Sequence, residues 1–171
     1  MNVFDFAMEM EDNGYKYYKS LASAATLPGL KTIFTSLAED ELKHFAIFRD
    51  LKAGNKSQAT AVSDSLKTAQ NIFSLLPRDE AGVKDMAGVL DAYKHAMKLE
   101  ADSHRFYEEA AEKEADPEIQ ALLLKIAAEE YEHFNILENI FSFVNAPNEH
   151  LAWAEFSNLG EFSSFGRDDN N

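Results

Sequence analysis

Six residues of types that bind metal ions occur in two matched sets along the chain. Each set has an isolated glutamate followed 30 residues later by the pattern Glu-x-x-His. The six residues are Glu11, Glu41, His44, Glu100, Glu130 and His133. Residues three apart lie side by side on a helix, so the glutamate and histidine of one pattern can bind the same ion. A glutamate on a facing helix can then bridge to a second ion, and the pattern therefore predicts a two-metal site.

These polar residues lie within apolar helix faces. In the stretch LAEDELKHFAIF, residues 37–48, Glu41 and His44 share one face with Leu37 and Phe48. The second Glu-x-x-His pattern is flanked by apolar residues in the same way. Burying four unpaired carboxylates would oppose folding by more than a typical total stability of about 5–15 kcal/mol. A buried site of this composition needs a compensating positive charge.

Two divalent cations would supply that charge. Four ionised glutamates contribute −4, two neutral imidazoles contribute nothing and two M²⁺ ions contribute +4, so the sum is zero. Nearby basic residues fall off the apolar faces, namely Lys16, Lys19, Lys43 and Arg105. Mixed carboxylate and imidazole ligands favour Fe, Mn or Zn over Ca or Mg, which prefer oxygen alone.

The elements that must position these residues are four long helices. Helical periodicity predicts them at about 3–26, 29–53, 84–115 and 117–145. Asp116 is the expected N-cap of the last helix, with Pro117 at its first position. Each pair of helices forms an αα-hairpin, and the long connection at 55–82 suits a crossover between hairpins.

The two hairpins read as copies of one another. A shift of 89 residues aligns all three metal-binding positions of one set with those of the other, without a gap. Over the 48 positions from Phe4/Tyr93 to Leu51/Ile140, 11 residues are identical. Ordinary composition would give roughly three by chance, so we interpret the match as an internal repeat.

Composition narrows the class of protein further. The 171 residues carry a net charge of −14, which disfavours nucleic acid and anionic membranes as partners and makes a cation the more natural ligand. The sequence contains no cysteine, so thiolate metal sites, disulfides and cysteine nucleophiles are excluded from these residues. No window is apolar enough for a membrane helix, and no signal segment is evident, so we expect a cytoplasmic protein.

The two isolated glutamates and the two Glu-x-x-His patterns, in this order along the chain, resemble the ferritin-like di-iron carboxylate superfamily. The stretches EMEDNGYKYY, with Glu11, Gly14 and Tyr18, and LAEDELKHF are similar to the rubrerythrin family, specifically its rubrerythrin-related ferritin-like domains. The resemblance covers about residues 3–145. It implies an all-α fold: a ferritin-like four-helix bundle of two pseudo-symmetric αα-hairpins joined by a long crossover, followed by a C-terminal tail.

This chain departs from the family pattern in two ways. Classical rubrerythrins have a further glutamate ligand three residues after the third-helix glutamate, where this chain has Ser103. They also carry a rubredoxin domain with four cysteines, whereas this sequence has none. The first departure puts classical peroxidase behaviour in doubt, and the second means that electrons must come from another molecule.

The function implied by the resemblance is that of a non-haem di-iron oxidoreductase. Such a protein would reduce peroxide or dioxygen at a carboxylate-bridged centre with electrons from an external donor, such as a rubredoxin-type protein. Its cofactor would be two iron ions per chain, with Mn or Zn as substitutes. Two alternatives stay open: iron handling with ferroxidase activity, and a non-enzymatic bundle with a structural zinc or mixed-metal site.

Further residues are candidates for supporting roles around the metals. Tyr18 and Tyr107 lie seven residues after a proposed ligand, where a phenol can bond a ligating carboxylate, although plain core packing is an equal alternative. Asp40 and Glu129 are placed to orient the histidine of the opposite copy, with a solvated surface role as the alternative. His104 has no histidine at the matching position of the first copy, so we expect it to be partly exposed.

The predicted domain boundaries follow the motifs. Residues 1–146 form the four-helix bundle, and residues 147–171 form an aromatic tail expected to dock on the bundle or on a partner. The tail carries apolar residues three apart or nearly so, including Trp153, Phe156, Phe162 and Phe165. An exposed apolar strip of this kind needs a cover. Together with the family resemblance, it leads us to expect a homodimer.

Overall fold

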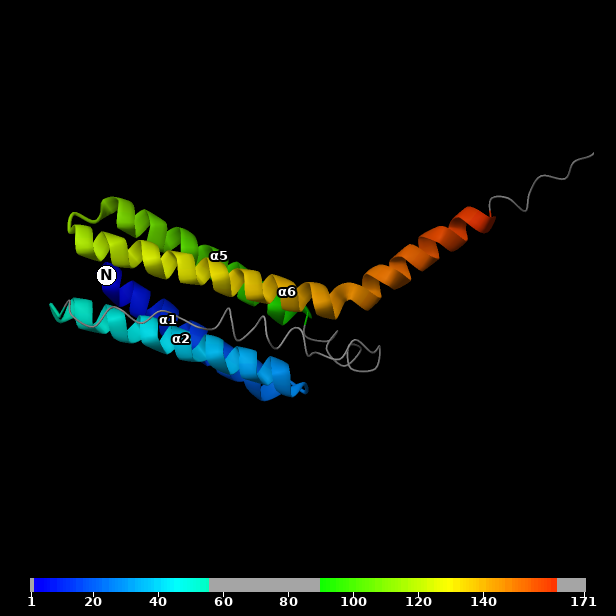
Figure 1. Cartoon of the computed structure of the whole chain (residues 1–171), viewed down its shortest axis with the longest axis horizontal. Coiled ribbons are helices and arrows are strands. Elements are labelled where there is room, and N and C mark those ends of the chain that lie inside the picture. Colours follow the sequence, from blue (N-terminus) through cyan, green and yellow to red (C-terminus); the bar gives the residue numbers. More distant parts are fainter. Residues whose placement is uncertain (1, 56–89, 163–171) are drawn as a thin grey trace, which may run out of the picture.

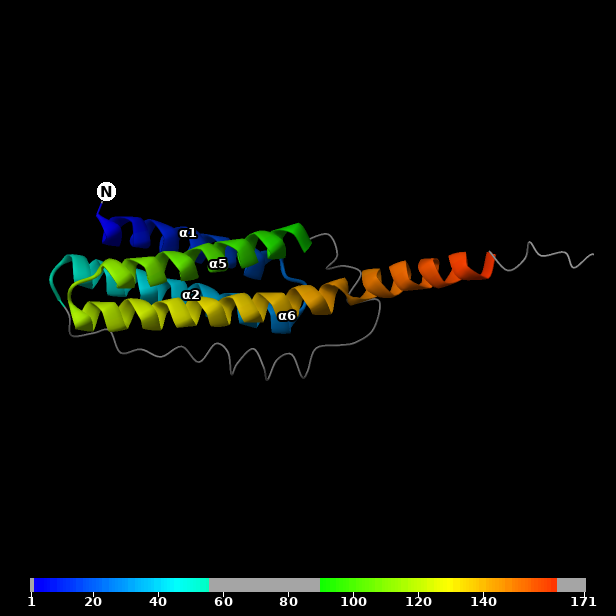
Figure 2. The same cartoon turned by 90° about the horizontal axis from the view of Figure 1, so that it is seen from above.

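The computed structural model describes residues 2–55 and 90–162, and within these ranges the chain is helical. The first hairpin consists of α1 (Val3–Ala24) and α2 (Pro28–Lys52), and the second of α5 (Leu90–Lys113) and α6 (Pro117–Phe162). The four helices run side by side as a bundle (Figures 1 and 2). The predicted ferritin-like fold of two αα-hairpins is confirmed.

Local sequence signals explain where the helices begin. The Asn2 side chain accepts a hydrogen bond from the Phe4 backbone N–H at 3.2 Å and so caps α1. The second helix of each hairpin begins with a proline, Pro28 in α2 and Pro117 in α6. At the first helical position the N–H that proline lacks would have no partner within the helix, so its absence carries no cost. The predicted cap of α6 is confirmed, because Asp116 accepts a bond from the Glu118 N–H at 3.0 Å.

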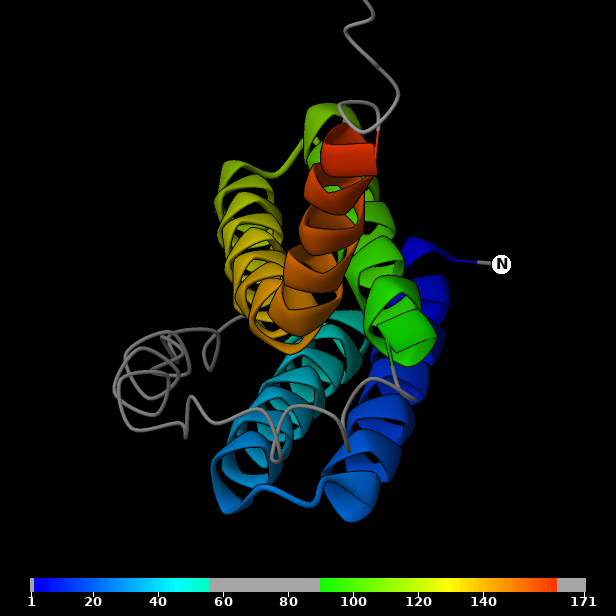
Figure 3. The ribbon, with the colours of Figure 1, turned by 90° about the vertical axis from the view of Figure 1, so that its right-hand side faces the viewer.

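The two hairpins face one another across the centre of the bundle. Seen end-on, α1 and α2 form one layer, and α5 and α6 form the other (Figure 3). Most inter-helix packing lies within each hairpin, and α1 meets α5 across the layers. The residues that connect the hairpins, 56–89, lie outside the described residues. The predicted crossover and the expected start of the third helix at 84 fall in that range.

The buried apolar residues form two clusters rather than one. One cluster includes Phe34, Leu37 and Ile140, and the other includes Phe48 and Leu123, each with contributions from all four helices. Within the described residues, seven buried side chains are polar or charged: Glu11, Asp40, Glu41, His44, Glu100, Glu130 and His133. The bundle therefore contains a polar centre within an otherwise apolar interior.

The prediction that the last helix ends near residue 145 was wrong. Helix α6 continues to Phe162, past Pro147, although proline lacks an N–H and its ring crowds the carbonyl four residues earlier. A helix that accommodates a proline bends, and α6 changes direction where it leaves the bundle (Figure 1). Docking of the aromatic tail stays a prediction, and Phe165 lies outside the described residues.

No helix in the described ranges has a stretch long and apolar enough to cross a membrane.

Candidate metal centre

The six predicted metal-binding side chains converge at the centre of the bundle. All are buried, with between 1% and 4% of their surface exposed. They divide into two overlapping groups, in each of which one donor atom per residue lies within 4.8 Å of the others. The first group is Glu11, Glu41, His44 and Glu130, and the second is Glu41, Glu100, Glu130 and His133. Two glutamates, Glu41 and Glu130, are thus common to both groups.

Each histidine turns its Nδ1 atom toward the carboxylates. His44 Nδ1 lies 2.9 Å from a Glu130 oxygen and 3.5 Å from a Glu11 oxygen. His133 Nδ1 lies 3.2 Å from a Glu41 oxygen and 3.7 Å from a Glu100 oxygen. The two imidazole rings are stacked with their centroids 6.0 Å apart. Both hairpins therefore contribute donors to each group.

The other nitrogen of each histidine faces an outer carboxylate from the opposite hairpin. His44 Nε2 forms a 2.9 Å hydrogen bond with Glu129, and His133 Nε2 lies 3.5 Å from Asp40. Asp40 also accepts a 2.7 Å bond from Lys43. A proton held on Nε2 leaves Nδ1 as a lone-pair donor, which is the state that binds a metal ion. The outer carboxylates favour that state.

Two buried tyrosines bond the isolated glutamates, again across the hairpins. The Tyr18 hydroxyl donates to Glu100, and the Tyr107 hydroxyl donates to Glu11. Both phenols are almost fully buried. Burial first, and the neighbouring carboxylates second, raise the pKa of each phenol well above its ordinary value. The tyrosines therefore stay protonated and fix one oxygen of each glutamate.

Without a metal, the negative charge of the buried carboxylates in this cluster is poorly compensated. Burial and the adjacent carboxylates raise the pKa of Glu41 and of Glu130 well above the ordinary glutamate value. Burial also tends to raise the pKa of Glu100, but the adjacent His133 imidazole and the hydrogen bond from Tyr18, among other groups, outweigh it and lower that pKa. Burial lowers the pKa of each histidine, yet the surrounding carboxylates raise it by more. The metal-free cluster thus holds protons where cations would otherwise sit.

The donor set fits two metal ions. Six buried polar atoms in the described residues have no hydrogen-bond partner, and all belong to the cluster: Glu11 Oε2, Glu41 Oε1, His44 Nδ1, Glu130 Oε1, His133 Nδ1 and His133 Nε2. The ion pairs found for the six side chains within those residues are with one another or with Asp40 and Glu129. Unsatisfied oxygen and imidazole donors in a net negative site are suited to divalent cations.

Comparison with known proteins supports the same conclusion. The family model described as Rubrerythrin matches residues 2–141. The chain belongs to the rubrerythrin family. Searches among curated proteins and among solved structures gave no match. The matched span contains all six candidate ligands of this rubrerythrin-family domain, whereas the end of α6 lies beyond it.

His104 lies apart from the cluster, as its lack of a matching histidine suggested. Its Nδ1 atom is 2.8 Å from the Ala127 carbonyl oxygen, and its Nε2 atom is 3.4 Å from Glu108. The residue connects α5 to α6 and is partly exposed, as expected.

Sequence reasoning did not assign a role to Gly14 beyond the family pattern. A side chain at this position would place its Cβ atom 2.8 Å from Glu41 Oε2, closer than packed atoms approach. The available signal was the glycine itself, because glycine inside a helix costs about 1 kcal/mol relative to alanine and needs a packing reason. Here the reason is the close approach of the Glu41 carboxylate.

Replacing Gly14 with alanine is expected to weaken metal binding without destabilising the metal-free protein. Alanine favours the helix, but its Cβ atom forces the Glu41 carboxylate to turn. We expect at least about tenfold weaker binding, a loss comparable to removing a supporting hydrogen bond. Titration of Fe²⁺ under anaerobic conditions and thermal melting measure the two effects. Ser23→Ala, an exposed change in the same helix, is the matched control. Unchanged affinity in the glycine variant would contradict this role for Gly14.

Proposed function

We propose that this rubrerythrin-family protein is a non-haem di-iron oxidoreductase that reduces peroxide or dioxygen with electrons from an external donor. The observation that carries the proposal is the pair of overlapping buried donor groups that share Glu41 and Glu130. Such a set of residues would hold two neighbouring ions, with the shared glutamates available to both. Iron is a redox-active metal that suits mixed glutamate and histidine ligands.

In this proposal, the six clustered residues hold the metals. Glu11 and His44 would hold one ion, Glu100 and His133 would hold the other, and Glu41 and Glu130 would contribute to both. Tyr18 and Tyr107 orient the isolated glutamates, Glu100 and Glu11, by donating hydrogen bonds. Glu129 and Asp40 orient the histidines from behind. Locked ligands of this kind limit rearrangement when the charge of the site changes.

When bound, the pair of iron ions would supply two electrons for reduction of the oxidant. For peroxide, the balanced reaction consumes two electrons and two protons, cleaves the O–O bond and yields two water molecules. The chain's own residues contribute a buried site in which packing holds all six side chains and hydrogen bonds also hold Glu11, Glu100 and His44. The described residues include no buried cysteine or lysine that would offer a competing nucleophile in this cluster.

The two alternative functions, iron handling and a structural zinc site, predict a different metal content from that of the proposed enzyme. An iron-handling protein would retain iron well beyond two ions per chain, whereas an enzyme would saturate at two. A structural zinc site would hold Zn²⁺, which does not change its oxidation state. Metal analysis, combined with ultraviolet–visible spectra before and after peroxide is added to the reduced protein, separates the three. The proposal expects two irons and a new near-ultraviolet band.

The double substitution His44→Ala and His133→Ala is expected to abolish peroxide turnover measured with an artificial reductant. Each change removes an imidazole donor from one of the two groups, so neither ion keeps its full set. His95→Ala is the control, because His95 is exposed and lies outside both groups. If the double variant retained both turnover and the wild-type metal content, this cluster would not be the site of the reaction.

An external electron donor and a homodimer also belong to this proposal. The donor is required because the reaction consumes electrons that the chain does not provide. The dimer rests on the family resemblance and on the apolar residues near the C-terminus, and it stays a prediction.

A further inference from the structure

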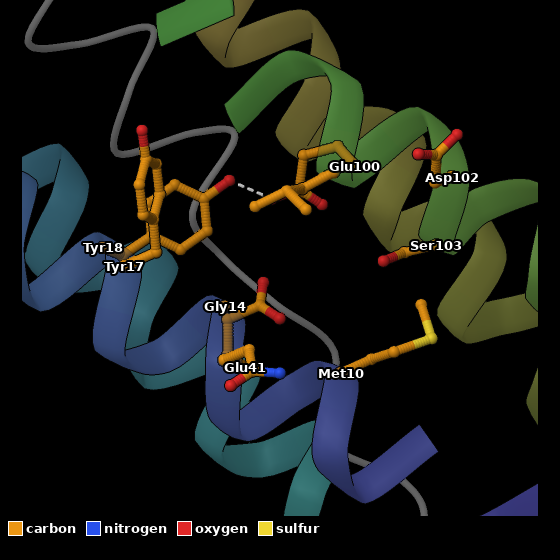
Figure 4. A pocket seen from close by; sticks show the side chains of 10 residues that line it. Met10, Gly14, Tyr17, Tyr18, Glu41, Glu100, Asp102 and Ser103 are labelled. Carbon is orange, nitrogen blue, oxygen red and sulfur yellow. Dashed lines mark hydrogen bonds between the residues drawn. The ribbon is translucent and has the colours of Figure 1, made fainter. Parts of the chain in front are cut away.

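A pocket lies between α1 and α5, next to the candidate metal centre. Its volume is about 120 Å³, and its walls include Met10 and Leu99 near Gly14 and Ser103. Figure 4 shows the Ser103 hydroxyl directed into the space between the two helices. The pocket also reaches Glu41 and Glu100, two of the candidate ligands.

The pocket joins exposed residues to buried ones. Asn13, one of the lining residues, is exposed, whereas Glu41 and Glu100 are only 4% and 3% exposed. Tyr18, which holds Glu100 by a hydrogen bond, is also part of the wall. Among the described residues, this lining therefore forms a path from the surface to donor atoms of the metal centre.

The pocket lies where the internal repeat brings matching positions together, but it is not symmetric. Three pairs of lining residues are related by the shift of 89: Met10 with Leu99, Asn13 with Asp102, and Gly14 with Ser103. The ligands that line it, however, are Glu41 and Glu100, and neither Glu11 nor Glu130 takes part. The pocket thus approaches the donor group that contains His133.

The difference between Gly14 and Ser103 accounts for this asymmetry. Gly14 has no side chain, and the Glu41 carboxylate occupies the place that a Cβ atom would need. At the matching position of the other hairpin, Ser103 places a side chain instead. The Glu41 carboxylate therefore reaches the pocket beside Gly14, whereas Ser103 lies at the matching position of the opposite wall.

We propose that this pocket admits the oxidant, and that Gly14 and Ser103 direct it to the donor group of Glu41, Glu100 and His133. The inference rests on the proposed function. It adds that the oxidant of that function must be small and uncharged, which excludes bulky hydroperoxides. A space of about 120 Å³ corresponds to roughly four water molecules at their liquid volume of about 30 Å³ each. Met10 and Leu99 give it apolar walls, which disfavour charged oxidants, and a hydroperoxide that carries a phenyl ring and two methyl groups is too large for such a space.

The test uses nitric oxide, an uncharged diatomic probe, with the full chain loaded with Fe²⁺ in the absence of oxygen. Ser103→Leu fills the pocket and leaves all six candidate ligands in place. Ala101→Leu adds the same side chain two residues away in α5, outside the lining, and is the matched control. Iron content is titrated first in every variant. We then expect Ser103→Leu to bind two irons but to bind nitric oxide at least about tenfold more weakly than the control.

A second measurement compares oxidants with the unmodified protein. Hydrogen peroxide should oxidise the iron-loaded protein much faster than cumene hydroperoxide does, because the larger molecule cannot enter. Equal nitric oxide binding by Ser103→Leu and Ala101→Leu would overturn the inference, and so would equal rates with the two hydroperoxides. If Ser103→Leu does not fold, the comparison of hydroperoxides decides. Failure of the unmodified protein to bind iron would instead refute the proposed function, and the iron titration registers that outcome separately.

Discussion

Glu130→Ala is expected to abolish binding of both metal ions, whereas Glu11→Ala is expected to abolish binding of one. Glu130 belongs to both donor groups, and Glu11 belongs to only one of them. Loss of a ligand shared by two ions should weaken binding by more than the roughly 10–100-fold that loss of an outer hydrogen-bond partner costs. The stoichiometry of bound iron, measured after dialysis against a weak chelator, distinguishes the two variants.

Glu138→Ala provides the control for this comparison, because Glu138 is exposed in the same helix as Glu130. It should retain both ions. Glu41→Ala should behave like Glu130→Ala, since Glu41 is the other shared residue. One ion retained by Glu130→Ala at wild-type affinity would show that Glu130 does not serve both ions.

Metal removal is expected to lower the melting temperature by about 10 °C or more. A ligand present at about a thousand times its dissociation constant stabilises the folded state by about 4 kcal/mol, and each kcal/mol shifts the midpoint by about 2–4 °C in a chain of this size. The structural reason is that the metals replace protons and neutralise four buried carboxylates. Equal midpoints with and without metal would show that the cluster is not a buried metal site.

The effect of metal on stability should also depend on pH, and its sign follows from the pKa shifts. In the metal-free protein, the raised pKa values of Glu41 and Glu130 mean that the folded state keeps protons that the unfolded state releases above about 4.5. The raised pKa values of His44 and His133 act in the same direction above about 6.5. Glu100, whose pKa is lowered, contributes stability that is lost only as pH falls below its ordinary range.

Stability of the metal-free protein should therefore fall as pH rises above about 5. The metal-loaded protein should not show this fall, because metal binding releases the same protons and strengthens as pH rises. Thermal melts of both forms across this range measure the difference. A gap between the two midpoints that narrows with rising pH would contradict the assignment of these residues as a proton-competing metal site.

The sequence by itself determined the type of fold and the residues that converge. Four apolar stripes with helical period, punctuated by Pro28 and Pro117, indicate two αα-hairpins, because no other regular element buries such a pattern. Charged residues repeated in register within those stripes must meet at the same level of the bundle. The shift of 89 residues, which aligns both Glu-x-x-His patterns, therefore predicts one cluster.

The sequence was a poorer guide to the end of α6. Pro147 is a strong stop signal on local grounds, because it lacks the N–H that would continue the helix. The structure nevertheless continues the helix to Phe162 with a change of direction. Helix propensity gives the energetic cost of a proline, but it does not tell whether the interactions of neighbouring residues exceed that cost.

Only the tertiary structure decided which partners each residue has. Periodicity places Tyr18 and Glu11 on one stripe of α1, yet Tyr18 bonds Glu100 in the opposite hairpin, and Tyr107 bonds Glu11 in return. The exchange arises because the phenol is long enough to cross the interface between facing helices, a distance that no one-dimensional pattern contains. The same holds for the pocket beside Ser103, since an empty volume is defined by several helices together. Sequence fixes which side chains a helix turns inward, whereas the packing of one hairpin on the other fixes what they touch.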